Sequence, residues 1–224
     1  MSTETGLRRD ARYNLDRILA SATEVFARNG LGATLADVAA QAGVGVGTVY
    51  RRFSNKNELI YEVYADRVHA TEALVRDASD AADIWPAFVR FLEESTRQLA
   101  GDRGMRELTT GGYTELLGWA RGSTPERLAT LLEDNHKVMG VHISKLVRRA
   151  KKAGELRVDF QPTDMMMLSL AVQATIDFGG AERPELYRRA LTLILDGLRP
   201  TREQTSKLPA PALSEADLLS IRRR

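Results

Sequence analysis

The chain has 224 residues, of which 43% are hydrophobic and 28% charged, and its 32 basic side chains nearly balance 30 acidic ones. This composition is typical of a globular protein and argues against a disordered, collagen-like or fibrous chain. Cysteine is absent, which excludes disulfides, thiolate zinc sites and cysteine nucleophiles. The sequence contains no run of about 18 apolar residues and no apolar signal-peptide core near its start. We therefore expect a cytoplasmic protein without membrane contacts.

The first third of the chain predicts four helices. Apolar residues recur at steps of three and four over about 13–29, a pattern typical of an amphipathic helix, and Gly30 follows it. Thr34 and Asp37 have the spacing of a capping box for a second helix. A short third helix is expected over about 46–53, and Asn55 can cap a long fourth helix over about 56–78.

The remaining two thirds carries five more helical patterns, separated by glycine and proline. They cover about residues 82–99, 105–118, 124–152, 162–179 and 184–198. Several glycines make the pattern over 105–118 a broken or short helix. The tail from Thr201 to Arg224 is expected to be mostly disordered. Because no segment alternates like a strand, the predicted fold class is all-α.

The stretch from Thr34 to Phe53, TLADVAAQAGVGVGTVYRRF, predicts two short helices joined by a glycine turn, which is a helix-turn-helix. Gly43 can end the first helix with positive φ, and Val44 and Val49 are expected to face inward. The residues left on the outside are Gly45, Val46, Gly47, Thr48, Tyr50 and Arg51. Small residues, hydroxyls and a guanidinium on one face suit the phosphates and base edges of duplex DNA.

The segment GVGVGTVYRRFSNKNELI resembles the helix-turn-helix signature of TetR-family transcriptional regulators. The residues that carry the resemblance are Ile18, Leu19, Ala22, Phe26, Gly30, Thr34, Gly43, Val44, Gly47, Thr48, Val49, Tyr50, Phe53 and Lys56. The resemblance covers about residues 13–71 in detail, and the rest matches in helix count and lengths. Two positions depart from the pattern, because Gly45 stands where serine is frequent and Arg52 where histidine is frequent.

The resemblance implies a three-helix DNA-binding domain followed by a larger helical domain for ligand binding and dimerisation. The expected parts are an N-terminal arm (1–12), the helix-turn-helix domain (13–55, with the signature reaching about 71), the second domain (56–199) and a flexible tail (200–224). The implied contacts with double-stranded DNA come from Thr34, Gly45, Val46, Gly47, Thr48, Tyr50, Arg51, Lys56 and, in the arm, Arg8, Arg9 and Arg12. Alternatively, Thr34 serves only as a cap, Tyr50 only packs, and the arm arginines are simply solvated.

A homodimer is expected, because a single short recognition helix supplies little affinity and paired helices reach successive major grooves of a palindromic operator. The last two helices are apolar enough to form a four-helix bundle with a second copy. The candidate interface residues are Met166, Leu170, Leu191 and Ile194.

A small-molecule effector that shifts the fourth helix is implied by the resemblance. The candidate pocket residues, chosen for aromatic area and one titratable group, are Trp85, Phe88, Trp119, His136 and Met139. Ordinary core packing accounts for the aromatic residues equally well. The predicted helices over 82–99, 105–118 and 124–152, which are expected to enclose this pocket, contain no inward-facing cluster of charged residues. A neutral, hydrophobic ligand is therefore expected.

The leading hypothesis is a DNA-binding transcriptional regulator. The resemblance to the TetR family implies a repressor that its ligand releases from DNA. A ligand-binding or interaction protein on the same fold, and an all-α enzyme, remain alternatives. No enzyme is expected, because the sequence contains neither a G-x-S-x-G motif nor a P-loop. His136 and His142 are six residues apart and share no helix face. No catalytic residue, metal or cofactor is therefore expected.

Overall fold

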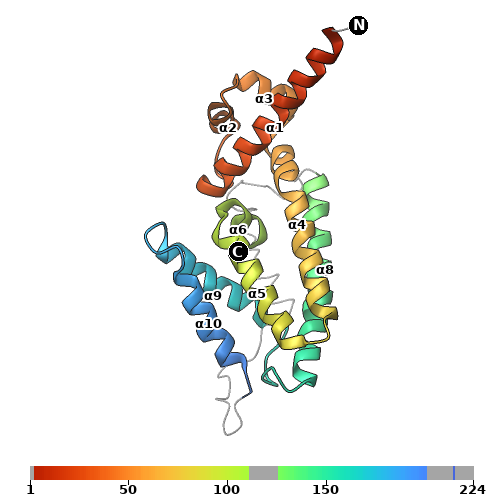
Figure 1. The fold of residues 1–224 in the computed structure, drawn as a ribbon, viewed down its shortest axis with the longest axis vertical. Coiled ribbons are helices and arrows are strands. Elements are labelled where there is room, and N and C mark those ends of the chain that lie inside the picture. The colour runs from red at the N-terminus through yellow and green to blue at the C-terminus, as the bar shows by residue number, and fades with distance from the viewer. Residues whose placement is uncertain (1–2, 111–125, 201–213, 215–224) are drawn as a thin grey trace. The chain divides into compact units, whose positions relative to one another are not determined.

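The computed structural model describes residues 3–110, 126–200 and 214. Every regular element in these ranges is a helix (Figure 1), which confirms the all-α prediction. The chain divides into two compact units. The first unit comprises Met1–Val68 and Gly101–Glu133, and the second comprises His69–Ala100 and Asp134–Arg224. Within the described ranges, no helix has the length and apolar character needed to cross a membrane.

The first unit contains the three N-terminal helices, helix α6 and parts of two other helices. These are α1 (Thr3–Asn29), α2 (Leu35–Ala42), α3 (Val46–Arg52), the first part of α4 (Lys56–Asp80), α6 (Arg103–Thr110) and the start of α8 (Glu126–Lys152). The unit therefore combines two separate stretches of the chain. It includes α6, which was expected in the second domain. The helix-turn-helix prediction is confirmed, with α2 and α3 close to their expected bounds.

Helix α1 begins at Thr3, well before the expected start near Tyr13. The segment expected to be an N-terminal arm is thus helical from Thr3 onward. Its charged residues show no apolar period, so sequence patterning did not reveal it. Arginine and alanine nevertheless favour helix, and extending an existing helix costs less than nucleating one.

The predicted caps form around α2. The Thr34 hydroxyl accepts a hydrogen bond from the Asp37 amide at 3.1 Å, and the Asp37 carboxylate accepts one from the Thr34 amide at 2.7 Å. Gly43 adopts the left-handed conformation with φ 62° and ends the helix. Arg17 of α1 donates to the Ala42 carbonyl at this end. The buried side chains of Val38, Ala39 and Ala42 complete the packing of α2.

Helix α6 is anchored within the first unit by a buried carboxylate. Asp102 is 2% exposed and accepts hydrogen bonds from the Met105 amide and the Tyr64 hydroxyl, each at 2.8 Å. Arg67 of α4 forms an ion pair with the same carboxylate. Burial, and then the neighbouring charge of Asp102, raise the pKa of Tyr64 well above its usual range, so the phenol stays a donor.

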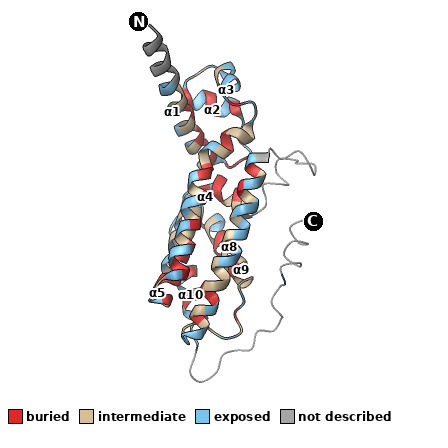
Figure 2. Ribbon diagram, turned by 90° about the vertical axis from the view of Figure 1, so that its right-hand side faces the viewer, coloured by how far each residue is buried: buried red, intermediate tan, exposed pale blue. Residues whose placement is uncertain are grey.

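The second unit contains α5 (Ile84–Ala100), α9 (Asp164–Gly179) and α10 (Leu186–Leu198), together with the later parts of α4 and α8. Its buried core includes Phe88, Phe91, Leu146, Val172 and Leu195 (Figure 2). The expected helices are present with small shifts at their ends. The expectation about the tail after Thr201 lies outside the described residues, as do residues 111–125.

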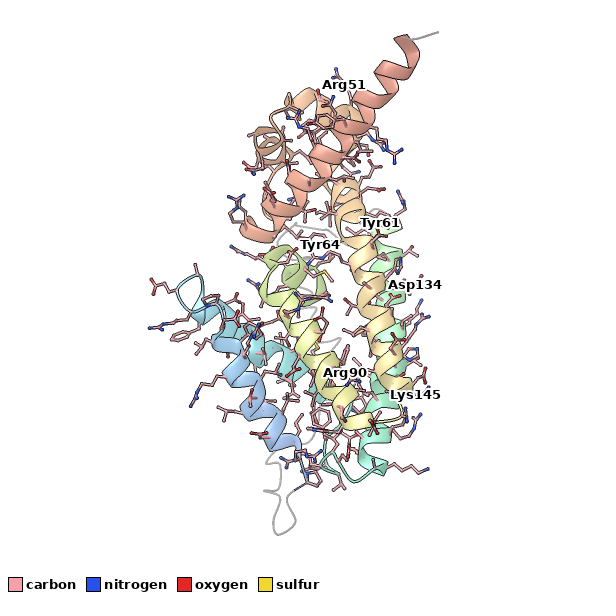
Figure 3. The ribbon with its side chains drawn as sticks, viewed as in Figure 1. Arg51, Tyr61, Tyr64, Arg90, Asp134 and Lys145 are labelled. Carbon is pink, nitrogen blue, oxygen red and sulfur yellow. The ribbon has the colours of Figure 1, made fainter. Side chains whose placement is uncertain are left out.

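Two hydrogen bonds and an ion pair tie α8 to the later part of α4 in this unit. His142 lies 2.9 Å from the Ser79 hydroxyl, and Arg149 donates to the Ser79 carbonyl at 2.7 Å. Lys145 forms an ion pair with Asp80 (Figure 3). These contacts place the C-terminal part of α8 beside the C-terminal part of α4, so the two helices run in the same direction here.

We expect Gly104→Ala to destabilise the protein by about 1–3 kcal/mol, because overpacking a buried site forces its neighbours to move. A β-carbon at Gly104 would overlap the Tyr64 hydroxyl and lie 3.0 Å from the Phe26 carbonyl oxygen. The matched control is Gly140→Ala on α8, where a β-carbon meets nothing within 4 Å. That change should stabilise its helix by up to about 1 kcal/mol. Urea unfolding followed by circular dichroism checks both, and equal effects would contradict the assigned packing.

Candidate nucleic-acid interface

Helix α3 turns nearly all of its surface outward. Among its seven residues, Val49 is the buried one, with 0% of its surface exposed. Val46 is 42% exposed and Tyr50 57% exposed, although both are large and largely apolar. Arg51 is exposed as well (Figure 3). A helix with this distribution is held by one anchor and presents a mixed apolar and basic face to a partner.

Two glycines leave the start of this face open. A β-carbon at Gly47 would meet nothing within 4 Å, and at Gly45 it would meet the Thr48 hydroxyl at 3.9 Å. Gly45 is the N-cap of α3 and supplies no side-chain cap, which is the consequence of its departure from serine. The Thr48 hydroxyl accepts a hydrogen bond from Arg51 at 3.1 Å. This bond directs the guanidinium along the exposed side of α3.

Thr34 is exposed at the N-terminus of α2, and its hydroxyl takes part in the capping box. It also donates to the Asp37 carboxylate at 2.8 Å. Hydrogen bonds from the Thr34 backbone and hydroxyl lower the pKa of Asp37, so the cap is ionised at neutral pH. The hydroxyl therefore has a structural role here, and its contact with a phosphate stays a prediction.

Lys56 is half-buried, and its ammonium donates to the Leu31 carbonyl at 2.7 Å. Burial lowers the pKa of Lys56, whereas the nearby Glu107 raises it. Sequence reasoning assigned Lys56 to a phosphate and missed this internal contact. Arg12 is exposed on α1, and the side chain of Arg8 lies outside the described residues.

The candidate pocket residues of the second unit have separate surroundings. Phe88 is fully buried in the core and stacks on Trp85, with ring centroids 5.4 Å apart. The Arg199 guanidinium lies 4.6 Å from the centre of the Trp85 ring. Met139 is half-buried against the same core, and His136 is exposed. Trp119 lies outside the described residues. Core packing accounts for Phe88, whose side chain has no exposed surface.

Sequence reasoning missed several polar side chains in the interior of this unit. Glu72 of α4, Thr96 of α5 and Gln173 of α9 are each 8% exposed. Glu72 lies 3.4 Å from His69, and Gln173 donates to Ser169 at 2.9 Å. A signal for Glu72 was present, because it lies four residues after Val68 and three before Val75, which are both buried.

The candidate residues of the dimer interface differ in how far they are exposed. Leu170 is 40% exposed and Met166 and Ile194 are half-buried, but Leu191 packs inside the core of the unit. The structure thus corrects the expectation that Leu191 faces a partner, since its surface is used within the protomer. On α9 and α10, the exposed large apolar side chains that sequence reasoning did not select are Met167, Phe178 and Leu193. Together with Leu170 they form what we name the apolar surface of α9 and α10.

Two family models match the chain. A model described as bacterial regulatory proteins of the tetR family matches residues 18–63. A model of the C-terminal domain of SbtR-like transcriptional regulators matches residues 85–200, which is 116 of the 224 residues. The two matches cover both the helix-turn-helix and most of the helices that follow it.

Individual proteins agree with the models. The probable HTH-type transcriptional regulator ArpR of Pseudomonas putida is 28% identical over 159 residues, which is 67% of this chain and 73% of that protein. A TetR transcription regulatory protein from Mycobacterium vanbaalenii, known from a crystal structure, is 28% identical in sequence, with a TM-score of 0.51. The match covers 87% of this chain and 99% of that chain. The regulator FadR of Bacillus subtilis, crystallised with stearoyl-CoA, is 20% identical, with a TM-score of 0.53. The match covers 83% of this chain and 100% of that chain. This last likeness shows the fold.

We expect Gly47→Ala to change stability and DNA affinity in opposite directions. Replacing an exposed helical glycine that has open space should stabilise the fold by up to about 1 kcal/mol. If α3 enters a groove, the added methyl group holds the backbone away and should weaken binding to a selected duplex at least about fivefold. Fluorescence anisotropy and thermal unfolding measure the two effects. Gly140→Ala is the control that should leave affinity unchanged, and unchanged affinity in Gly47→Ala would argue against groove contact here.

Proposed function

The chain belongs to the TetR family of DNA-binding transcriptional regulators, and on that premise we propose that it is a repressor released from its operator by a small hydrophobic molecule. In this proposal a homodimer binds a palindromic operator in the cytoplasm, and the ligand binds in the second unit. The observation that carries the proposal is the outward face of α3, which has exposed apolar and basic side chains and a single buried anchor.

The chemistry of α3 supports reading of a major groove. Val46 and Tyr50 expose apolar surface that can contact thymine methyl groups, and the Tyr50 hydroxyl can reach a phosphate. Arg51 and Arg52 supply positive charge in the last turn, and the sequence of α3 contains no acidic residue. Gly45 and Gly47 permit close approach of the backbone. Thr34, Lys56, Arg8 and Arg12 are proposed to add phosphate contacts around this face.

The apolar surface of α9 and α10 supports a homodimer. Phe178 is 87% exposed and Leu193 63% exposed, and water contact with side chains of this size is unfavourable. Met167, Leu170, Ala174 and Phe178 are spaced by three and four residues, which places them on one face of α9. A second copy that covers this face in a four-helix arrangement would remove it from water.

A small-molecule effector is supported by the interior of the second unit. FadR of Bacillus subtilis, a structural neighbour, holds an acyl chain attached to a polar carrier. In this chain a largely apolar interior also encloses Glu72, Thr96 and Gln173. Such a combination suits a hydrophobic ligand oriented by a few polar groups. Trp85, His136 and Met139 remain proposed neighbours of the ligand, whereas Phe88 contributes to the core.

Selection of bound duplexes from a random DNA library tests the function. We expect the purified protein to enrich a palindromic sequence, and its affinity to fall steeply with salt because phosphate binding releases counterions. A reporter controlled by that sequence should be expressed less when the protein is present, and a library of hydrophobic compounds should contain one that restores expression. Failure to enrich any sequence would refute the proposal, and activation of the reporter would refute the repressor role.

We expect Leu170→Glu and Leu193→Glu to produce folded monomers, because each places an unpaired charge on a surface that the partner would cover. Sedimentation velocity measures the mass, and circular dichroism checks the fold. Val158→Glu is the matched control, since Val158 is an 80% exposed apolar residue outside α9 and α10. A wild-type protein that sediments as a monomer while binding its operator would contradict the proposed dimer.

A further inference from the structure

The backbone of Leu31, between α1 and α2, is held by charged side chains from outside the helix-turn-helix. The Leu31 amide donates to the Glu107 carboxylate of α6 at 2.6 Å. The Leu31 carbonyl accepts from the Lys56 ammonium, in the first turn of α4, at 2.7 Å. Both backbone polar groups of Leu31 therefore have charged partners, and such hydrogen bonds are stronger than neutral ones.

Glu107 is itself held in place. Its other carboxylate oxygen accepts from Arg103 at 2.8 Å, and its side chain is 14% exposed. A β-carbon at Gly30 would collide with this carboxylate, at 2.6 Å from Oε2, and Gly30 also has a φ of 75°. Glycine at position 30 thus permits both the left-handed turn and the close approach of Glu107.

Helix α6, which carries Glu107, is fixed against α1 and α4 in the same unit. Asp102 caps it and accepts from the Tyr64 hydroxyl and from Arg67. Gly104 packs against the Phe26 carbonyl near the end of α1. Since both ends of the Glu107 contact are anchored, the hydrogen bond to Leu31 transmits the position of α6 to the turn between α1 and α2.

From these contacts we propose that Glu107 is a positioning residue for α3, the helix proposed to read DNA, and that it acts through the backbone of Leu31. Leu31 precedes α2 closely, and α2 in turn packs against α3 through Gly43 and the buried Val49. Holding the backbone of Leu31 between α6 and α4 sets the inclination of α2 and hence of α3. Glu107 itself touches no DNA in this proposal, which rests on the proposed operator binding.

Two substitutions separate the hydrogen bond from the charge. Glu107→Gln keeps an oxygen acceptor at the same reach but removes the charge, whereas Glu107→Asp keeps the charge but is one methylene too short to reach the Leu31 amide. We expect Glu107→Asp to lose about tenfold in affinity for the duplex selected with the wild-type protein. Glu107→Gln should stay within about threefold. The dependence of affinity on salt should keep its wild-type slope in both, because no phosphate contact is lost.

Fluorescence anisotropy measures the affinity and its salt dependence on the selected duplex and on a random duplex. Circular dichroism checks that each variant is folded. Glu94→Gln is the control, because Glu94 pairs with Arg97 at 2.6 Å in the second unit and should not affect binding when changed. Wild-type affinity in Glu107→Asp, a larger loss in Glu107→Gln than in Glu107→Asp, or a changed salt slope would each overturn the positioning role. A wild-type protein that selects no sequence would instead refute the proposed function.

Discussion

One buried side chain holds α3, the second helix of the helix-turn-helix. Helix α3 has seven residues, which is too short to be stable alone, and Val49 is its anchor in the interior. Its geometry is therefore set by what surrounds it, namely the left-handed turn at Gly43, the cap of α2 and the packing of α2 on α1. An exposed face of this kind can be chemically optimised for a partner, because it contributes little to folding.

The polar contacts of the first unit serve the same constraint. Leu31 lies in a turn where no helix satisfies its amide and carbonyl, and buried backbone groups without partners are costly. Glu107 and Lys56 supply those partners from α6 and α4. Asp102 does the equivalent for α6 by joining its first turn to Tyr64 and Arg67. Long-range hydrogen bonds thus add to the apolar core of the first unit, which includes Phe26, Val38 and Val49.

The second unit distributes its residues differently. Phe178 and Leu193 are on its surface, whereas Glu72 and Gln173 are in its interior. A monomeric protein gains nothing from exposing large apolar side chains, and burying a carboxylate costs free energy. The proposed function would account for this arrangement, because a second copy would cover the exposed side chains and a ligand would meet polar groups inside. The same unit can then serve both assembly and response.

Local signals in the sequence determined the helices, the capping box at Thr34 and the turn at Gly43, because each depends on residues within a few positions of one another. The signature around Val49 and Tyr50 also identified the family and the exposed face of α3. Tertiary structure decided the rest. The apolar residues of α10 form a broad face, so their spacing alone could not show that Leu191 lies in the core and Leu193 on the surface. The partners of Lys56 and Glu107 are 25 and 76 residues away along the chain. Such contacts form only when the helices pack, and no local pattern encodes them.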